Sequence, residues 1–462
     1  MQRYLYIILF FLVLLTPFVL RLAVTRGTAA PVAGRDARRL VVVTPHNQDI
    51  RREFARAFNQ WHIEHYGEPV LIDYRVPGGT NDIKRMLENT YRAQLRPDAT
   101  FSPALVADIH VVWGGGDYFF GEELNKLFEV QGRRFGILQP LELDRQLLRE
   151  AFPQEALAGV KLYDVRRDDA GNLLPPRWVG VCLSSFGIVY NPDLFRALEL
   201  PSPQTWRDLT HERLAGMLAL ADPTHSASAA VAYMMVLQRA MADAEEQFLA
   251  EHGSLPGNEM KTHAAHHAAI ADGWRRGMGQ LLLIAANARY FTASSSQVPS
   301  DVGHGEAAAG LAIDFYGRVF QETVGSDRIR FVSPAAATAI NPDPVAILHG
   351  VQGKPLATAT RFVEFLLTPQ AQRLWILKPG HPDGPTDRSL RRPPIRRDVY
   401  TDRTGWADDV DPFAEAGGFN QRSEWMVLFT DTRPLWAAAW IDSRDVLKDS
   451  YATIRRVRDD RA

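Results

Sequence analysis

Three polar, glycine-containing segments follow hydrophobic runs in the N-terminal third of the chain, and their residue types suit ligand binding through hydrogen bonds. They contribute His46 and Asn47, then Gly79 and Thr80, then Gly115 and Gly116. Glycine lets a backbone approach a ligand closely, although a tight turn needs it for the same reason. Ligands of open parallel sheets bind beyond the carboxyl ends of the strands, so we expect these segments to line one site.

Hydroxyl side chains gather in two later segments. Ser226 and Ser228 precede an Ala- and Met-rich run that is typical of a helix. Free N–H groups at a helix start can bind an anion with such hydroxyls, and N-capping by one serine is the alternative. Ser184 and Ser185 lie within a long apolar segment, Trp178–Tyr190, that reads as extended. We predict that both pairs face a ligand.

Three further candidates carry charge or a phenol. Arg289 can form a bidentate pair with a carboxylate or a phosphate, or lie in an ordinary loop. Asp314 and Tyr316 follow the apolar run 308–313, which reads as a strand. Asp314 could pair with an ammonium group of a ligand, and Tyr316 could instead be a half-buried aromatic side chain at a strand end.

Catalytic signatures are missing. The chain has neither a Gly-x-Ser-x-Gly nucleophile elbow nor a His-Glu-x-x-His zinc motif, and no phosphate-binding loop of the Walker type. His263, His266 and His267 could share a helix face and hold zinc or nickel, but a solvated helix face is the favoured interpretation. We therefore predict a protein that is not an enzyme and has no cofactor or resident metal.

Composition narrows the class of protein further. The 462 residues are 46% hydrophobic and 23% charged, which is ordinary globular composition. The 52 Lys and Arg residues nearly balance the 54 Asp and Glu residues, so the net charge of -2 argues against nucleic-acid binding. The single cysteine, Cys182, excludes an intrachain disulfide.

The first 30 residues differ from the rest. One positive charge precedes an apolar run from Tyr4 to Leu20, which is typical of a signal peptide and lies near the lower limit, about 17 residues, for a spanning helix. A cleaved signal peptide and an uncleaved membrane anchor both remain open. In either case we expect the chain beyond residue 30 to be exported.

The remaining chain reads as two series of alternating strands and helices. Apolar runs at 39–44, 70–75 and 107–113 alternate with helical periodicity at 50–65 and 81–92, which is typical of an open, mostly parallel sheet. A second series begins after Tyr190, and the chain returns to the first near Ala339. We predict an α/β fold with two lobes and a ligand cleft between them. The Arg- and Pro-rich run 388–397 is expected to be a solvated loop or a contact for lipid or a permease.

Several motifs resemble, in order, those of bacterial extracellular solute-binding proteins. They are the segment from Trp178 through Asn191-Pro192, the Thr205-Trp-Arg-Asp-Leu209 segment with 214–226, the Gly305-Glu-Ala-Ala-Ala-Gly310 turn, and the 362–372 helix. The resemblance covers nearly all of residues 39–377, and it is greatest to the branch that binds ferric ion, phosphorylated sugars or phosphonates.

The resemblance implies a two-lobed type II (Venus-flytrap) fold with mixed sheets, working as the periplasmic component of an ABC-type importer with an inner-membrane permease. It also implies a monomer, with lobe 1 at 38–185 plus 339–462 and lobe 2 at 186–338. In the ferric branch two adjacent tyrosines bind iron, but here Phe315 replaces the first and only Tyr316 matches. A small anionic or zwitterionic solute is therefore preferred, with a ferric site of Tyr316, Asp314 and His46, or a membrane-tethered sensor, as the alternatives.

Overall fold

The computed structural model describes residues 37–459, apart from 99, 103, 104, 106, 254–262 and 416–418. The predicted signal peptide or anchor at 1–30 lies outside the described residues. Within the described part of the chain, no helix combines the length and the apolar character that crossing a membrane requires.

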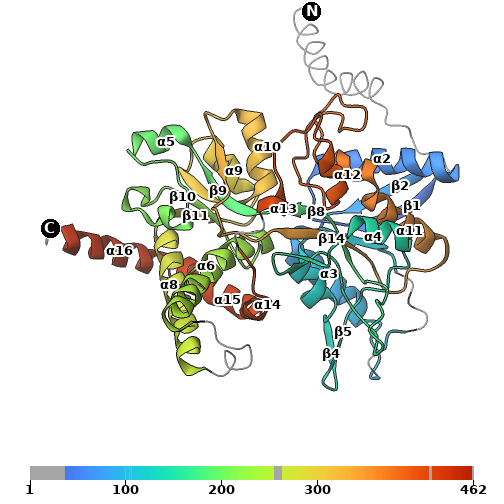
Figure 1. The fold of residues 1–462 in the computed structure, drawn as a ribbon, viewed down its shortest axis with the longest axis horizontal. Helices are drawn as coiled ribbons and strands as arrows, with labels where there is room; N and C mark the ends of the chain where they lie inside the picture. The colour runs from blue at the N-terminus through green and yellow to red at the C-terminus, as the bar shows by residue number, and fades with distance from the viewer. Residues whose placement is uncertain are drawn as a thin grey trace, which may run out of the picture.

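The first lobe is built on a five-stranded sheet in the order β2-β1-β3-β14-β8 (Figure 1). Its strands are β1 (Arg38–Val43), β2 (Val70–Arg75), β3 (Val111–Trp113), β8 (Val179–Ser184) and β14 (Asn341–Ile347). β1 pairs in parallel with β2 and β3, whereas β14 runs antiparallel to β3 and β8. The helices of this lobe include α2 (Gln48–Tyr66), α3 (Thr80–Arg92), α4 (Arg145–Ala151), α11 (Gly353–Leu367) and α12 (Pro369–Leu374).

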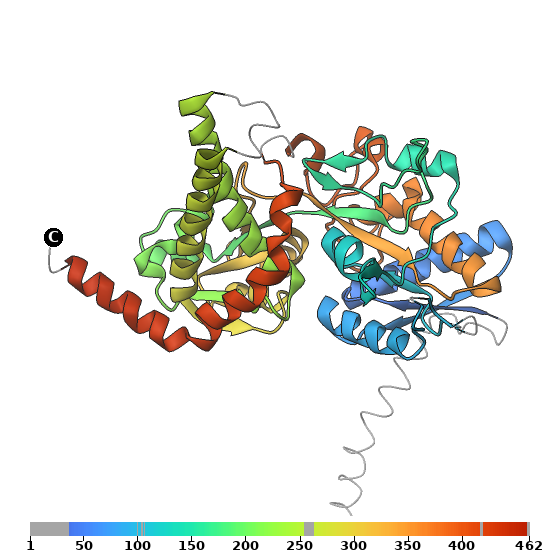
Figure 2. The same cartoon turned by 90° about the horizontal axis from the view of Figure 1, so that it is seen from below.

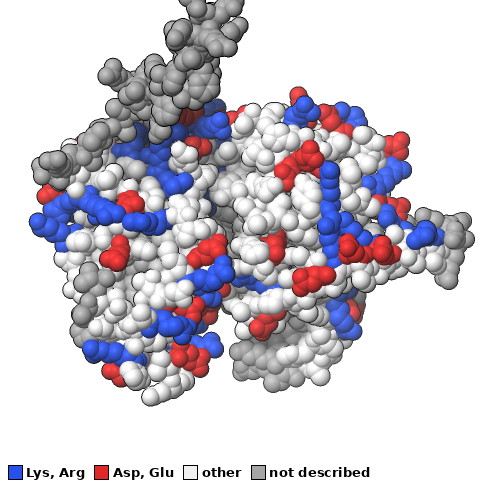
Figure 3. All heavy atoms as spheres, turned by 180° about the vertical axis from the view of Figure 1, so that it is seen from behind, with Lys and Arg blue, Asp and Glu red and all other residues white. Residues whose placement is uncertain are grey.

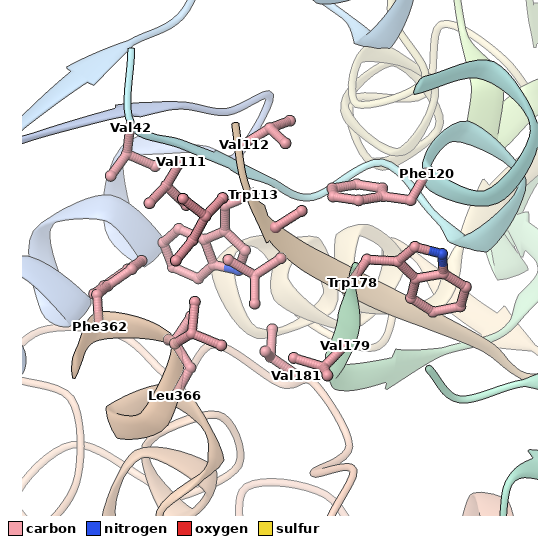
Figure 4. Packing of buried hydrophobic residues seen from close by; sticks show 14 of the residues in the cluster. Val42, Val111, Val112, Trp113, Phe120, Trp178, Val179, Val181, Phe362 and Leu366 are labelled. Atoms are coloured by element: carbon pink, nitrogen blue, oxygen red, sulfur yellow. The ribbon is translucent and has the colours of Figure 1, made fainter. Parts of the chain in front are cut away.

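Apolar side chains of this sheet pack against α2 and α11. Trp113 lies at the centre, 5.6 Å from the ring of Phe362 and 5.3 Å from the ring of Phe54 between ring centroids. Figure 4 shows Trp113 beside Val111, Phe362 and Leu366. The helical spacing of Phe54, Ala57, Phe58 and Trp61 explains why α2 presents one continuous apolar face to the sheet.

The second lobe has a matching five-stranded sheet in the order β11-β10-β12-β9-β13. Its strands are β9 (Phe186–Tyr190), β10 (Leu218–Ala221), β11 (Ala288–Thr292), β12 (Ala309–Ile313) and β13 (Arg330–Val332). β9 is the antiparallel strand here, between β12 and β13. The helices are α5 (Pro192–Ala197), α6 (Ala227–His252), α8 (Ala264–Ala286), α9 (Gln297–Gly303) and α10 (Asp314–Val324).

The predicted α/β fold of two lobes is confirmed, and the chain passes between the lobes twice within the series of strands. β8 ends at Ser184 in the first sheet and β9 begins at Phe186 in the second, so the extended segment Trp178–Tyr190 is two strands. The second passage lies between Val332 and Asn341. β14 is antiparallel to both of its neighbours in the first sheet, and β9 is antiparallel to both of its neighbours in the second. Both sheets are therefore mixed.

Some elements were not predicted. β14 and β11 were missed, because Pro342 and Pro344 interrupt β14 and a polar loop adjoins β11. The third strand is shorter than 107–113, since only Val111–Trp113 pairs with its neighbours. Two small hairpins, β4 (Phe128–Val130) with β5 (Arg133–Phe135) and β6 (Ala156–Leu157) with β7 (Val160–Lys161), are additions to lobe 1.

The C-terminal region departs from the predicted lobe boundaries. Residues 389–396 are inserted beside β8 in lobe 1, where Leu183 N–H donates to the Pro393 carbonyl at 2.8 Å. The helical tail instead packs on lobe 2, although 339–462 was assigned to lobe 1, because its tryptophans Trp425, Trp436 and Trp440 enter the lobe 2 core. Figure 2 shows the tail crossing beneath that lobe. Its helices are α13 (Pro412–Glu415), α14 (Ser423–Met426), α15 (Leu428–Trp436) and α16 (Arg444–Asp459).

The tail should contribute to the stability of lobe 2 through Trp436. This side chain is fully buried, its ring lies 5.8 Å from Tyr233 and 5.7 Å from Trp440, and its Nε1 donates to Met278 Sδ at 3.3 Å. We expect Trp436→Ala to lower the free energy of unfolding by about 3–5 kcal/mol, measured by urea denaturation. The neighbouring Leu435 is 46% exposed, so Leu435→Ala should change it by no more than about 0.5 kcal/mol. Equal effects of both substitutions would contradict this packing.

Candidate functional site: the cleft between the two lobes

The carboxyl edge of the first sheet carries a buried polar cluster. His46 follows β1, Gly115 follows β3, Ser184 ends β8, and Asp343 lies near the start of the antiparallel β14, so all four reach the same edge. His46 Nε2 lies 2.7 Å from Asp343 Oδ2, and the Gly115 N–H donates to Asp343 Oδ1 at 2.8 Å. Gly115 has a φ of 131°, and a Cβ there would lie 2.6 Å from Thr80 Cγ2, so only glycine fits.

Arg392 enters this cluster from the C-terminal region. It is 2% exposed, its Nη1 donates to Asp343 Oδ2, and its Nη2 donates to Ser184 Oγ at 2.6 Å. Nη1 also lies 3.3 Å from His46 Nε2. The guanidinium carbon lies 4.4 Å from the ring centroid of Phe315, which belongs to lobe 2. One side chain therefore joins the floor of the cleft to both lobes.

Burial and the ion pair set the charges of the cluster. Burial by itself would raise the pKa of Asp343, but the charges of Arg392 and His46 and the Gly115 N–H together hold that pKa well below its usual value. Burial would lower the pKa of Arg392, and the Asp343 carboxylate reverses this and raises it. Burial lowers the pKa of His46 and outweighs the effect of Asp343, so the imidazole is neutral near pH 7.

Lobe 2 places a second acid opposite this cluster, at the end of β12. Asp314 is buried at the first turn of α10, where it accepts hydrogen bonds from Phe315 N–H at 2.8 Å and from Ser185 Oγ at 3.3 Å. Burial raises the pKa of Asp314, and Arg318, whose Nη1 is 3.9 Å away, opposes this rise. Burial likewise raises the pKa of Tyr316, which therefore keeps its phenolic proton.

A chain of hydroxyl groups lies at the same edge of the second sheet, where β10 leads into α6. Ser226 caps the 26-residue helix α6 and accepts from Ala229 N–H at 3.3 Å. Its Oγ lies 3.2 Å from Ser228 Oγ, which in turn lies 2.8 Å from Ser295 Oγ. The start of a long helix with three linked hydroxyls suits an anion, because its first N–H groups point outward.

The helix start of lobe 1 approaches this segment. A Cβ on Gly79 would lie 3.1 Å from the His225 carbonyl oxygen, and the Asn81 amide donates to the Thr224 carbonyl. Thr80 is buried, and its hydroxyl oxygen has no hydrogen-bond partner among the described residues. The lobes therefore touch at this end of the cleft, and Thr80 leaves one polar group unsatisfied beside the contact.

The structure brings most of the predicted site residues to the facing edges of the two lobes. These are His46, Gly79, Thr80, Gly115, Gly116, Ser184, Ser185, Ser226, Ser228, Asp314 and Tyr316. Whether each contacts a ligand stays a prediction.

Two predicted residues have other roles. Asn47 accepts from Ile50 N–H at 3.0 Å and so caps α2. Arg289 lies at the start of β11, whereas the cleft lies beyond the end of that strand, and its guanidinium forms an ion pair with Glu306 at 3.4 Å. Arg289 therefore lies away from the other candidates, whereas its neighbouring serines follow the end of the strand.

The interpretation of 388–397 as a solvated loop or a lipid contact is also wrong for its central part. Arg392 and Arg396 are both buried, and Arg396 forms ion pairs with Asp398 at 2.6 Å and Glu150 at 3.2 Å. Sequence reasoning missed Arg392 and Asp343. The only signal was proline next to each of them, which indicates rigid backbone at a point where charge would otherwise suggest solvent.

The histidines at 263, 266 and 267 have other contacts in the part of the chain that the structure describes. No group of three His, Cys, Asp or Glu side chains in the described residues is placed to hold a metal ion. His263 caps α8, and His266 Nε2 lies 2.9 Å from Glu245, which also pairs with Arg422. His266 and Glu245 border a cavity of about 980 Å³ between α6, α8 and the tail, so the helix face is not wholly solvated.

The chain matches known proteins at the level of family and fold. Residues 159–383 match the family model "Bacterial extracellular solute-binding protein". The whole fold is similar to the periplasmic binding protein AfuA from Actinobacillus pleuropneumoniae, solved with fructose-6-phosphate, with a TM-score of 0.54, 17% identity, and coverage of 87% of this chain and 98% of that chain. A substrate-binding protein of an ABC transporter from Agrobacterium tumefaciens gives a TM-score of 0.56, with 12% identity over 88% of this chain and 95% of that one. Residues 159–383 therefore match a bacterial extracellular solute-binding domain, and the chain has the fold of the type II periplasmic binding proteins.

A curated relative is more distant. The chain is 24% identical over 196 residues to the phosphoglycerate transport regulatory protein PgtC of Salmonella typhimurium, which is 42% of this chain and 40% of that protein. The chain thus spans about two fifths of the length of the relative that it matches.

We expect the free energy of unfolding to depend on the ion pair between Arg392 and Asp343. Arg392→Met leaves a buried carboxylate without its counter-charge, and we expect a loss of about 3–5 kcal/mol in the free energy of unfolding. Adding Asp343→Asn removes the unpaired charge and keeps an acceptor for the Gly115 N–H, so the double variant should recover much of that loss. Guanidinium chloride unfolding measures both. A double variant that is no more stable than Arg392→Met would contradict the ion pair.

The neutral His46 predicts a pH dependence. Its folded-state pKa lies below the ordinary value near 6.5, so the unfolded state binds an extra proton as the pH falls through that value, and the fold loses stability. The loss is at most about 1.4 kcal/mol per pH unit for one such histidine. His46→Gln should reduce the loss between pH 7 and pH 5 relative to the unchanged protein, as measured by urea unfolding at each pH. An identical slope in both proteins would show that His46 does not titrate in this way.

Proposed function

We propose that this protein captures a small anionic solute in the cleft between its lobes and delivers it to the permease of an ABC-type importer. The observation that carries the proposal is the pair of sheets whose polar carboxyl edges face each other across two crossing segments. Such lobes can close around a ligand by rotation at the crossings, which is how this class of domain works. A solute carrier needs no nucleophile, and the proposal includes no catalytic step and no cofactor.

The charges favour an anion over ferric ion. At the floor of the cleft Arg392 neutralises the Asp343 carboxylate, so this acid offers a trivalent cation no net negative charge. Of the three residues predicted for an iron site, His46 is already bound to Asp343, and burial favours the protonated forms of Tyr316 and Asp314. Deprotonated ligands are what a hard metal ion needs. The start of α6 with its linked serines offers hydrogen-bond donors to a phosphate or carboxylate instead.

The relatives support the same chemical class. AfuA was solved with fructose-6-phosphate, and PgtC is named for phosphoglycerate transport. We infer a phosphorylated organic acid or sugar as the preferred solute. The importer permease, an extracytoplasmic location and a monomeric state belong to this proposal. Figure 3 shows acidic and basic side chains interspersed over one face, which agrees with the expectation that the protein does not bind nucleic acid.

A second candidate is a membrane-tethered sensor that presents the ligand-bound lobes to a signalling partner. The word "regulatory" in the name of PgtC favours it. Mapping the N-terminus of the mature protein separates the two, because release of the processed protein from the membrane would count against a tethered sensor.

A thermal-shift screen tests the solute class. The panel contains 3-phosphoglycerate, fructose-6-phosphate, aminoethylphosphonate, a polyamine and ferric citrate. A ligand at 100 times its Kd stabilises the folded state by about 2.7 kcal/mol, which is a readily measured rise in Tm. We expect a phosphorylated compound to give this rise. A rise with ferric citrate alone would overturn the anion proposal.

The hydroxyl chain supplies a matched test for the compound that binds. Ser228→Ala removes one hydroxyl at the start of α6 and should weaken binding by roughly tenfold or more, because hydrogen bonds to charged groups contribute about 1.5–3 kcal/mol. Arg289→Met removes a positive charge at the far end of β11 and should leave the Kd unchanged. Isothermal titration calorimetry measures both. Weakening by Arg289→Met, with no effect of Ser228→Ala, would place the anion elsewhere.

A further inference from the structure

The tail forms a third connection between the lobes, separate from the two crossing segments. Helix α15 is anchored on lobe 2 by fully buried Trp436 and by Phe429, both members of the lobe 2 core. In Figure 2 this part of the tail rises beside α6 toward the space between the lobes. The anchoring on lobe 2 is apolar, and its main contact, Trp436, packs against Tyr233 and Trp440 of the same lobe.

α15 also meets lobe 1, through aromatic and hydroxyl groups. The hydroxyl oxygens of Tyr118 and Thr430 lie 2.5 Å apart, and the rings of Tyr118 and Phe429 have centroids 4.7 Å apart. Tyr118 lies between β3 and the π-helical turn Phe119–Leu124 of lobe 1. Thr430 is exposed, so this contact is small and lies at the surface, in contrast to the anchoring on lobe 2.

Arg433 makes the charged part of the connection. It is 8% exposed, its Nε donates to the Pro223 carbonyl of lobe 2 at 2.9 Å, and its Nη1 lies 3.7 Å from Glu123 Oε1 of lobe 1. Glu123 also meets Lys84 of α3 at 3.3 Å. Arg433 is thus held by lobe 2 and reaches across to a carboxylate of lobe 1.

The same arginine touches the segment that leads to the start of α6. Besides Pro223, its Nη2 lies 3.5 Å from the Thr224 carbonyl, which also accepts from Asn81 of lobe 1. Residues 222–225 lead directly to Ser226, the first of the linked serines. A group that holds this segment against lobe 1 therefore acts on the geometry of the cleft without lining it.

We propose that α15 is a clasp that stabilises the closed arrangement of the lobes, with Arg433 as its positioning residue. The clasp rests on the proposed function only in that closure is the working motion of a solute-binding protein. When the lobes rotate apart at the crossings, α15 stays on lobe 2, and the Arg433–Glu123 and Thr430–Tyr118 contacts break. Two polar contacts are weak enough to break and form again. The clasp therefore changes the ratio of open to closed forms without fixing the protein in either form.

The populations can be measured without any ligand. Spin labels are attached to cysteines introduced at Glu64 on α2 and Ala197 on α5, which are exposed in lobe 1 and lobe 2 respectively. The native Cys182 is fully buried, so it does not take up label. Double electron–electron resonance on the complete mature chain then gives the distance distribution between the lobes.

We expect one dominant distance in the otherwise unchanged protein and a second, longer distance in Arg433→Met. The ratio of open to closed forms should rise by up to about fivefold, since an ion pair between the lobes is lost and such a pair contributes up to about 1 kcal/mol. Arg207→Met removes an exposed arginine from lobe 2 and should leave the distribution unchanged. An identical distribution for Arg433→Met and the unchanged protein would overturn the clasp.

A second variant keeps the test valid if Arg433→Met fails to fold. Tyr118→Phe removes only the hydroxyl group that meets Thr430, and it should populate the longer distance to a smaller extent while the Tm stays within a few degrees. No longer distance in a folded Tyr118→Phe protein would count against the clasp in that case. Because the measurement uses no solute, a failed ligand screen would leave the clasp standing, and a failed clasp would leave the solute class untouched.

Discussion

The ion pair of Arg392 with Asp343 is the interaction on which the architecture of the cleft depends. Asp343 collects the His46 imidazole, the Gly115 N–H and the Arg392 guanidinium, so the ends of β1 and β3 and the start of β14 are tied to one carboxylate. Arg392 extends the connection to β8 through Ser184 and to lobe 2 through Phe315. Removing two charges from water is costly, and this arrangement offsets the cost because both oxygens of Asp343 and both terminal nitrogens of Arg392 have partners. The floor of the cleft is therefore rigid, and motion has to occur around it.

The C-terminal region builds both the rigid and the movable part of the cleft. Its first portion supplies Arg392 to the floor, and its last helices cover lobe 2 and reach back to Tyr118 and Glu123 of lobe 1. The family match ends at residue 383, before either contribution. Arg392 and the contacts of α15 with lobe 1 thus come from a part of the chain that lies beyond the family match.

The hydrophobic pattern predicted the two lobes because each sheet is made of short apolar runs followed by helices with one apolar face, as in β1 with α2. The residues around the cleft were predicted where they follow such runs, as with His46, Ser226 and Asp314. The roles of Asp343 and Arg392 could not be predicted, because both depend on contacts between segments far apart in the sequence. The charged and proline-rich sequence around each residue indicated an exposed position. The position of Arg289 could not be predicted for a related reason. The strand β11 was not recognised in the sequence, so it was not known that Arg289 lies at its start and the serines beyond its end. Long-range pairing, and not local propensity, decided these positions.

The position of β14, which carries Asp343, determines the order in which the two sheets can be completed during synthesis. β14 is an interior strand of the first sheet, between β3 and β8, yet it comes after every strand of the second sheet in the sequence. Its prolines leave two positions without an N–H donor, and the register shifts at Asp343, so few alternative pairings place that carboxylate at the edge. As the chain emerges, lobe 2 has all its strands by residue 332, whereas lobe 1 waits for a strand that begins at residue 341 and for an arginine at residue 392. The sheet that starts first is thus completed last, and β3 and β8 lack the strand between them until the passage through lobe 2 is over.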